Sequence, residues 1–308
     1  MTPPVAGRYL LLDQIGTGGM GSVWRARDLR TGRLVAVKVL GQHSGALLAR
    51  FVREQAIRLR HPHVVAPTGW AAEDDLVLLT MDLVRGGTVQ DLLAEHGPLP
   101  EGCVATILEQ TLQALTSVHA AGLVHRDVKP ANLLLEPTVD GSVHVRLGDF
   151  GVAVAVAEER LTTSPAAIGT EGYMAPDLLR GDAPHPRQDL YAVGVLGVHL
   201  LTGRRPRVGV PLPATRLLPL LQALLAEDPG QRPQSPEQAL TLLRRLAIAP
   251  NPGPWARDRL GPAPDEPQTR SSTGWPTGWS AALTVALSLA TTVACLATIV
   301  VLCWPHRS

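Results

Sequence analysis

The sequence predicts an α+β fold in two lobes, followed by a linker and one membrane-spanning helix. Short β-rich runs fill the first third of the chain, and longer helical patterns follow them. An uncharged apolar run from Ala281 to Cys303 then comes after a stretch rich in Pro and Gly. The expected parts are a folded domain over 9–246, a linker over 247–279, a transmembrane helix over 280–304 and a short tail over 305–308.

The first lobe is expected to be a sheet with one helix. A helical pattern at Ala46–Arg60 places Leu47, Phe51 and Glu54 on one face. The expected strands on either side of this helix are Tyr9–Ile15, Ser22–Arg27, Leu34–Leu40, Val64–Trp70 and Leu76–Met81.

The second lobe is expected to be mostly helical. Apolar residues recur every three or four positions in Glu101–Ala120, which predicts an amphipathic helix. Ala192–Leu201 is apolar nearly all round and should be buried. Val143–Leu147 looks like a strand. A β-rich lobe followed by a helical lobe leaves a cleft between them.

The C-terminal zones predict attachment to a membrane. The Pro- and Gly-rich stretch from Ala247 to Thr277 cannot bury enough apolar surface to order itself, so we expect an extended tether. The 23 residues of the apolar run would span about 34 Å as a helix. Arginines are more frequent before the run than after it, which favours a cytoplasmic folded domain in a single-pass protein of the cell membrane. We expect no signal peptide and no extracellular sensor. Trp275, Trp279 and Trp304 are expected at the two membrane interfaces.

Charge and cysteine content exclude several classes of function. The formal net charge is +1 and the basic residues form no block, which argues against nucleic acid as a partner. The three cysteines fit neither a metal-ligand spacing nor a secreted disulfide framework, so we expect reduced structural thiols.

A glycine-rich turn lies between the first two expected strands. Glycines let the backbone approach a phosphate group closely, with N–H groups as hydrogen-bond donors. A dinucleotide-binding loop has similar spacing, but it requires a helix after the turn, whereas Ser22–Arg27 continues as a strand. The turn is therefore expected to cover a nucleotide phosphate, and its residues are Ile15, Gly16, Thr17, Gly18, Gly19, Met20, Gly21, Ser22 and Val23.

Of the twenty-eight Lys and Arg residues, only Lys38 and Lys129 are lysines. The guanidinium is a planar fork and the ammonium a compact point charge, so positions that keep lysine in an arginine-rich chain are candidates for a specific role. Phosphoryl transfer calls for an ammonium between the α- and β-phosphates, held by a carboxylate on a nearby helix. Lys38 is the candidate ammonium and Glu54 the candidate carboxylate, although Glu54 could instead be a solvated helix residue paired with an arginine.

A second group of candidates lies in the segment from His125 to Asn132. Asp127 can orient an attacking hydroxyl and accept its proton, and Lys129 can neutralise the transferring phosphoryl group. Asn132 can bind Mg²⁺, and Asp149, in Asp-Phe-Gly seventeen residues later, offers a second metal ligand.

The order of these motifs resembles the protein kinase superfamily. The motifs are Gly16–Val23, Lys38, Glu54, His125–Asn132, Asp149–Gly151, Gly169-Thr170 and Tyr173–Asp177. Their details are similar to bacterial eukaryotic-like Ser/Thr kinases with a C-terminal transmembrane anchor. The resemblance implies the bilobal kinase fold, with one regulatory helix in the β-rich lobe, and it covers about residues 9 to 246.

Further roles follow from the resemblance alone. It implies that Asp189 braces the catalytic loop, and that ATP binds with Mg²⁺ or Mn²⁺. It implies protein substrates modified on Ser or Thr, and a homodimer is left open. Beyond the glycine-rich turn, the implied ATP site comprises Ala36, Lys38, the gatekeeper Met81, the hinge residues Asp82 to Val84, and Leu134.

A regulatory loop is expected between Gly151 and Ala175. Arg126, beside Asp127, is a ready partner for a phosphate group on that loop. Autophosphorylation there should raise activity. The candidate acceptors are Thr162, Thr163 and Ser164.

Three departures from the family pattern bear on regulation and substrate docking. Asp177 replaces the usual Glu, so its pair with Arg232 must close with one methylene less. Arg58 replaces an apolar residue, and the stretch from Arg205 to Leu217 is short and proline-rich.

The leading hypothesis is an active Ser/Thr protein kinase that autophosphorylates and signals near the membrane. The alternative is a pseudokinase or scaffold at the membrane, and a small-molecule kinase is a third, weaker hypothesis.

Overall fold

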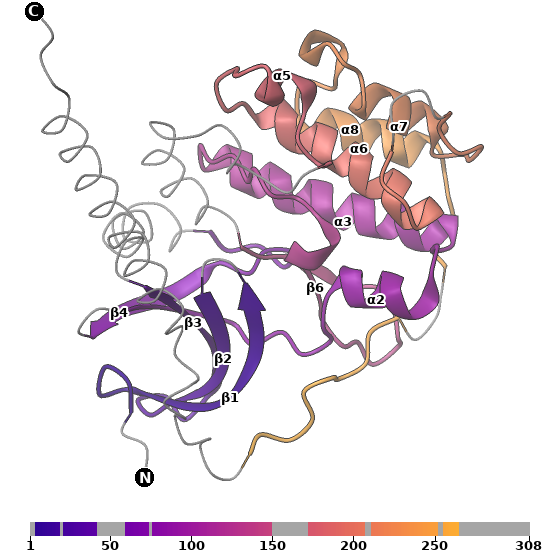
Figure 1. The fold of residues 1–308 in the computed structure, drawn as a ribbon. Coiled ribbons are helices and arrows are strands. Elements are labelled where there is room, and N and C mark those ends of the chain that lie inside the picture. The colour runs from indigo at the N-terminus through magenta and orange to yellow at the C-terminus, as the bar shows by residue number, and fades with distance from the viewer. Residues whose placement is uncertain are drawn as a thin grey trace, which may run out of the picture.

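The computed structural model describes residues 4–18, 21–41, 59–73, 76–149, 172–206, 211–251 and 255–264. Most of the helix expected at Ala46–Arg60 lies outside these residues. The described chain forms a sheet lobe and a helical lobe, and the segment after Met81 leads from the first to the second (Figure 1).

A five-stranded antiparallel sheet forms the first lobe. Its strand order is β1-β2-β3-β5-β4. Buried Tyr9, Val37 and Leu78 pack together on one of its faces, as expected where every second residue of a strand points to the same side. The strands are β1 (Tyr9–Gly18), β2 (Gly21–Asp28), β3 (Leu34–Gly41), β4 (Pro67–Glu73) and β5 (Leu76–Met81).

Helices around the long α3 form the second lobe, together with a two-stranded sheet. The apolar face of α3 is buried, with Ile107, Leu112 and Val118 fully enclosed. Buried Cys103 lies in the same core, and burial raises the pKa of its thiol to about 12, as expected for a structural cysteine. The elements are α2 (Val89–His96), α3 (Glu101–Ala120), η2 (Pro130–Asn132), β6 (Leu133–Leu135), β7 (Val145–Leu147), α5 (Pro176–Leu179), α6 (Pro186–Thr202), α7 (Leu218–Leu224), η4 (Pro229–Gln231) and α8 (Pro236–Arg245).

Several expected boundaries were wrong. The strand expected at Tyr9–Ile15 continues to Gly18, and the strand expected at Val143–Leu147 begins at Val145. The strand expected at Val64–Trp70 begins three residues later, because Val64 instead makes an isolated bridge with Leu147 of the second lobe. The helix expected at Ala192–Leu201 begins already at Pro186, where His185 caps the first turn. The bounds of α3 and β5 are those the sequence predicts.

Part of the stretch expected to be an unordered tether packs against the folded domain. Ala256 is 7% exposed and belongs to the core of the helical lobe. The Trp255 indole N–H donates to the Asn251 carbonyl at 3.0 Å. Residues 255–264 then run past α2 and the connection between the lobes toward the sheet (Figure 1). Trp255 and Ala256 pack into the apolar core, and backbone and ionic contacts hold the residues that follow them.

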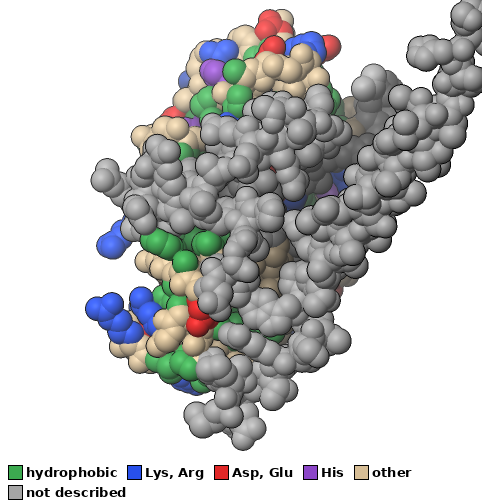
Figure 2. Space-filling view, turned by 60° about the vertical axis from the view of Figure 1, so that its left-hand side comes forward, with side chains coloured by type: hydrophobic (Ala, Val, Ile, Leu, Met, Phe, Trp, Pro, Cys, Tyr) green, Lys and Arg blue, Asp and Glu red, His purple; other side chains and the backbone are tan. Residues whose placement is uncertain are grey.

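Within the described part of the chain, no helix is long and apolar enough to cross a membrane. The expected span at 280–304 and its flanking tryptophans lie outside the described residues. On the face that Figure 2 shows, the described Lys and Arg side chains lie in separate small groups.

Candidate active site

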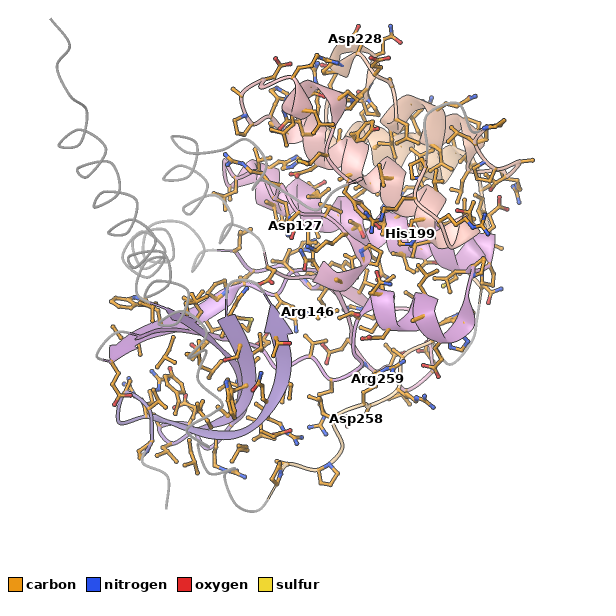
Figure 3. All side chains as sticks on the ribbon, viewed as in Figure 1. Asp127, Arg146, His199, Asp228, Asp258 and Arg259 are labelled. Atoms are coloured by element: carbon orange, nitrogen blue, oxygen red, sulfur yellow. The ribbon has the colours of Figure 1, made fainter. Side chains whose placement is uncertain are left out.

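The loop between α3 and η2, together with η2 itself, brings the candidate residues Asp127, Lys129 and Asn132 together. Asp127 lies on the side of the helical lobe that faces the sheet (Figure 3). The Lys129 ammonium is 2.7 Å from Asp127 Oδ2. The Asn132 amide nitrogen donates to Asp127 Oδ2 at 2.9 Å and to the Asp127 carbonyl at 2.7 Å. A carboxylate, an ammonium and an amide therefore meet within hydrogen-bonding distance.

A buried carboxylate from α6 fixes the backbone of this loop. Asp189 is 1% exposed, and its two oxygens accept the backbone N–H groups of His125 at 2.8 Å and Arg126 at 2.7 Å. Arg126 has a positive φ of 66°, a strained conformation for a non-glycine residue. His119 of α3 contacts the same carboxylate, with Nε2 2.8 Å from Oδ2. The hydrogen bonds of Asp189 therefore brace the loop, as the resemblance implied.

His125 connects the loop to the segment that precedes Asp149. Its Nδ1 accepts the Asp127 N–H at 3.2 Å, so its Nε2 must carry the proton that it shares with the Gly148 carbonyl at 3.0 Å. Burial lowers the pKa of His125, which keeps this neutral tautomer. Protonation of Nδ1 would remove the acceptor that holds the Asp127 backbone.

Lys38 of β3 reaches across to the second lobe. Its side chain is 8% exposed, and its Nζ is 2.6 Å from Asp149 Oδ1. On the sheet, Lys38 lies opposite Val23 of β2 and Leu79 of β5. Asp149 has a positive φ of 59°. The ammonium and the candidate metal ligand are therefore in direct contact between the lobes.

Asn132 and Asp149 fit the expected role of cation ligands. The Asn132 nitrogen is used by Asp127, so the amide oxygen is the atom left for a cation. The Asp149 side chain is 46% exposed despite its bond to Lys38. Among the described residues, no group of three or more His, Cys, Asp or Glu side chains could hold a metal ion. Mg²⁺ suits this pair, because it is commonly held by one or two protein ligands together with substrate phosphates.

The glycine-rich turn is a hairpin between β1 and β2. Gly16 lies opposite Val23, and Gly18 opposite Gly21. Gly21 has a φ of 144°, and a Cβ there would lie 2.0 Å from the Val39 carbonyl oxygen. The need for glycine at this position therefore comes from β3, which the sequence alone did not show. Gly19 and Met20, at the tip, lie outside the described residues.

The residues expected around adenine lie on both lobes and at their connection. The side chains of Ile15, Val23, Met81, Val84 and Leu134 are only half-buried, and they leave apolar surface that a base could cover. Ala36, opposite Met81 on the sheet, is buried.

Arg146 of β7 anchors the connection between the lobes. It is 2.8 Å from the Asp82 carboxylate and donates to the Val64 carbonyl at 3.0 Å. Figure 3 shows Arg146 between the sheet and the helices, and its bond to Asp82 ties the hinge to the helical lobe.

Several expected site residues remain sequence predictions. Glu54, Arg58, Phe150, Gly151, Thr162, Thr163, Ser164, Gly169 and Thr170 lie outside the described residues.

The pair expected between Asp177 and Arg232 is present despite the shorter side chain. The Arg232 Nη2 atom is 2.6 Å from Asp177 Oδ1, and both side chains are buried. Gln188 of α6 donates to the other oxygen at 3.0 Å. Burial raises the pKa of Asp177, but the bonds from Arg232 and Gln188 outweigh this and leave the pKa below its usual value.

The short stretch from Arg205 to Leu217 is fixed to the first turn of α3. Glu101 accepts the Arg216 N–H at 2.6 Å and also the Thr215 hydroxyl. Leu217 is fully buried. In its described part this stretch thus has a defined attachment to α3.

Sequence reasoning missed the residues that support the site from a distance. His119, Gln188 and Arg146 act through partners 70, 11 and 64 positions away. No local pattern marks such pairs. The role of His125 could have been suspected from its place beside Asp127.

Comparisons with known proteins agree with this geometry. The family model described as protein kinase domain matches residues 9–242. The Ser/Thr-protein kinase PkaA of Streptomyces coelicolor is 35% identical over 79% of this chain and 46% of that protein. PknL of Mycobacterium tuberculosis, also a Ser/Thr-protein kinase, is 40% identical over 66% of this chain and 51% of that protein. The chain therefore spans about half the length of these curated relatives.

A solved structure supports the fold. The crystal structure of Rad53 1-466 in complex with AMP-PNP superposes with a TM-score of 0.64 at 25% identity, over 77% of this chain and 65% of that one. With a β-sheet lobe, a helical lobe and a family match over most of its length, the chain belongs to the protein kinase domain family.

Proposed function

We propose that this chain is a Ser/Thr protein kinase, which transfers the γ-phosphoryl group of ATP to Ser and Thr hydroxyls of proteins. The observation that carries the proposal is the cluster of Asp127, Lys129 and Asn132 on a loop braced by Asp189. The names of relatives at 35–40% identity support the choice of Ser and Thr.

Each residue has a role that its position allows. Asp127 orients the substrate hydroxyl and accepts its proton, and Lys129 offsets charge on the group in transfer. Lys38 holds the nonreacting phosphates, and Asn132 and Asp149 would hold Mg²⁺ or Mn²⁺. A cation held by these two residues would neutralise phosphate charge.

The test is transfer of label from radiolabelled Mg·ATP to a generic protein substrate by the full chain. We expect phosphoserine and phosphothreonine in the product. Asp127→Asn should lower the rate about a hundredfold or more, because it removes the proton acceptor. Phosphate on tyrosine alone, or on a small molecule alone, would contradict the proposal.

Autophosphorylation is a second part of the proposal. Thr162, Thr163 and Ser164 are hydroxyl residues in the stretch between the Asp-Phe-Gly motif and Ala175. A phosphate there would find Arg126 as a partner beside Asp127. Phosphopeptide mapping of the full chain should find at least one of the three modified in wild type and none in Asp127→Asn.

We further propose that the chain is anchored in the cell membrane by residues 280–304, with the kinase domain in the cytoplasm and signalling close to the membrane. The uncharged apolar run and its flanking tryptophans support this. Alkaline extraction of membranes should leave the full chain in the pellet and release a variant ended after Pro264. Release of both would contradict the anchor.

A further inference from the structure

Residues 255–264 contact the helical lobe, the hinge and the sheet lobe in turn. Ala256 is buried in the core of the helical lobe. The Arg257 and Arg259 guanidinium groups both bind Glu95 of α2. The backbone N–H of Arg259 donates to the backbone carbonyl of Arg85 at 2.8 Å. The Arg85 guanidinium is 2.6 Å from Asp258 Oδ2.

The sheet lobe holds the far end of this segment through a buried arginine. Arg25 of β2 is 2% exposed and pairs with Asp13 of β1 at 2.6 and 2.9 Å. Its Nη1 atom also donates to the carbonyls of Leu260 at 3.3 Å and Gly261 at 3.1 Å. Loss of these acceptors would leave a buried charged donor without protein partners on that side, which is costly.

A turn within the segment presents these carbonyls. Asp258 Oδ1 accepts the N–H groups of Leu260 at 2.9 Å and Gly261 at 3.1 Å. Gly261 has a φ of 60°, a conformation that glycine adopts without strain. The Gly261 carbonyl also accepts from Arg85 at 2.6 Å. Arg25 of the sheet and Arg85 of the hinge therefore bind the same carbonyl.

Two glycines of the helical lobe leave room for the returning chain. A Cβ on Gly102 of α3 would lie 2.3 Å from the Ala249 carbonyl oxygen. A Cβ on Gly87, just after the hinge, would lie 2.7 Å from the Arg259 side chain. Alanine is otherwise preferred to glycine within a helix. The close packing of residues 249–251, and not the stability of α3, therefore explains the glycine at position 102.

We propose that residues 255–264 form a strap that holds the two lobes at a fixed spacing and thereby sets the affinity for nucleotide, with Arg25, Arg85 and Asp258 as positioning residues. Rotation of the lobes about the hinge changes the separation of Arg25 from Glu95. The strap spans these two residues, so opening must break its bonds to one of them. Figure 3 shows Asp258 and Arg259 beside the connection between the lobes. This inference rests on the proposed kinase function, because it concerns the site where ATP binds.

The test compares the full-length chain with Asp258→Ala, which removes the Arg85 pair and both caps of the turn. We expect the KM for ATP to rise about threefold to tenfold, the effect of one or two charge-assisted hydrogen bonds, while kcat changes less than about twofold. Asp258→Asn keeps an oxygen for the turn and should recover part of the loss. Glu109→Ala, which breaks an exposed ion pair with Arg244 away from the strap, is the matched control.

A second variant perturbs the chain just before the strap, at residues 249–251, without changing charge. Gly102→Ala should displace residues 249–251 and raise the KM for ATP as Asp258→Ala does. Hydrogen exchange provides a readout that needs no catalysis: both variants should speed exchange in residues 76–88 about threefold or more relative to Glu109→Ala. Unchanged exchange and unchanged KM in an active enzyme would overturn the strap and leave the kinase function intact. Faster exchange in a chain without activity would support the strap and contradict the proposed function.

Discussion

At the scale of single residues, Lys38 shows why an ammonium is retained in a chain that otherwise uses arginine. Its Nζ approaches Asp149 to 2.6 Å from a side chain that is almost fully buried. A guanidinium is wider and planar, and it would not place one point charge at that position. The two lysines of the chain thus lie at two contacts, one with Asp149 and the other with Asp127.

The Lys38→Arg variant tests this difference. We expect kcat/KM for ATP to fall about a hundredfold, because the charge is kept but displaced by about an ångström. Arg27→Lys, the reverse exchange at an exposed position on the neighbouring strand, should have no effect. Wild-type activity of Lys38→Arg would mean that the two lysines are an accident of composition.

The buried His125 should make the unfolding free energy depend on pH. Burial holds its pKa below the value of 6.5 that it has in the unfolded chain. Below about pH 6.5 the unfolded chain therefore binds more protons than the folded one, and the unfolding free energy of wild type decreases with falling pH. His125→Gln lacks this contribution, so its stability deficit relative to wild type should shrink as the pH is lowered. Chemical denaturation from about pH 5 to 8 measures the deficit, and a constant value would contradict the prediction.

At the scale of elements, the buried pair of Asp177 and Arg232 joins α5 to the segment before α8. Arg232 also donates to the carbonyls of Ala226 at 2.8 Å and Glu227 at 3.2 Å, and its guanidinium lies 5.0 Å from the Tyr191 ring centre. These extra partners satisfy the buried charge. They also explain how Asp177 serves where a longer side chain is usual.

Removal of Asp177 should be severe. Asp177→Ala leaves Arg232 buried without its carboxylate, and we expect the unfolding free energy to fall by about 3–5 kcal/mol. The exposed pair of Arg244 and Glu109 provides the comparison, since Glu109→Ala should cost less than about 1 kcal/mol. Equal losses in the two variants, measured by denaturant titration, would refute a special role for the buried pair.

Elements with a strong apolar period were predictable from the sequence, and those fixed by distant contacts were not. The 20 residues of α3 repeat apolar positions over five turns, so both ends were found. The eight-residue α2 has only three buried residues between two glycines, and it was missed. The start of β4 was misplaced, because the pairing of Val64 with the other lobe has no local signal.

At the scale of the whole molecule, contacts between the lobes determine the site. Lys38 and Asp149 are 111 positions apart, and Arg25 and Gly261 are 236 apart. The sequence motifs assign Lys38 and Asp149 to the same nucleotide site, but they predict Glu54, and not Asp149, as the carboxylate partner of the lysine. No chemical motif predicts the second pair, and a Pro- and Gly-rich composition suggested the opposite of the ordered segment that the structure shows.

Phosphate transfer by the full chain, measured as a function of Mg²⁺ concentration and compared with Asp149→Asn, shows whether the site carries out phosphoryl transfer. Wild type should label a protein substrate and saturate with Mg²⁺. Asp149→Asn should stay folded, as judged by thermal melting, and lose transfer at every Mg²⁺ concentration, because it lacks one of two cation ligands. A wild-type chain as inactive as Asp149→Asn with both Mg²⁺ and Mn²⁺ would contradict the kinase function and favour a scaffold that has the kinase fold without its chemistry.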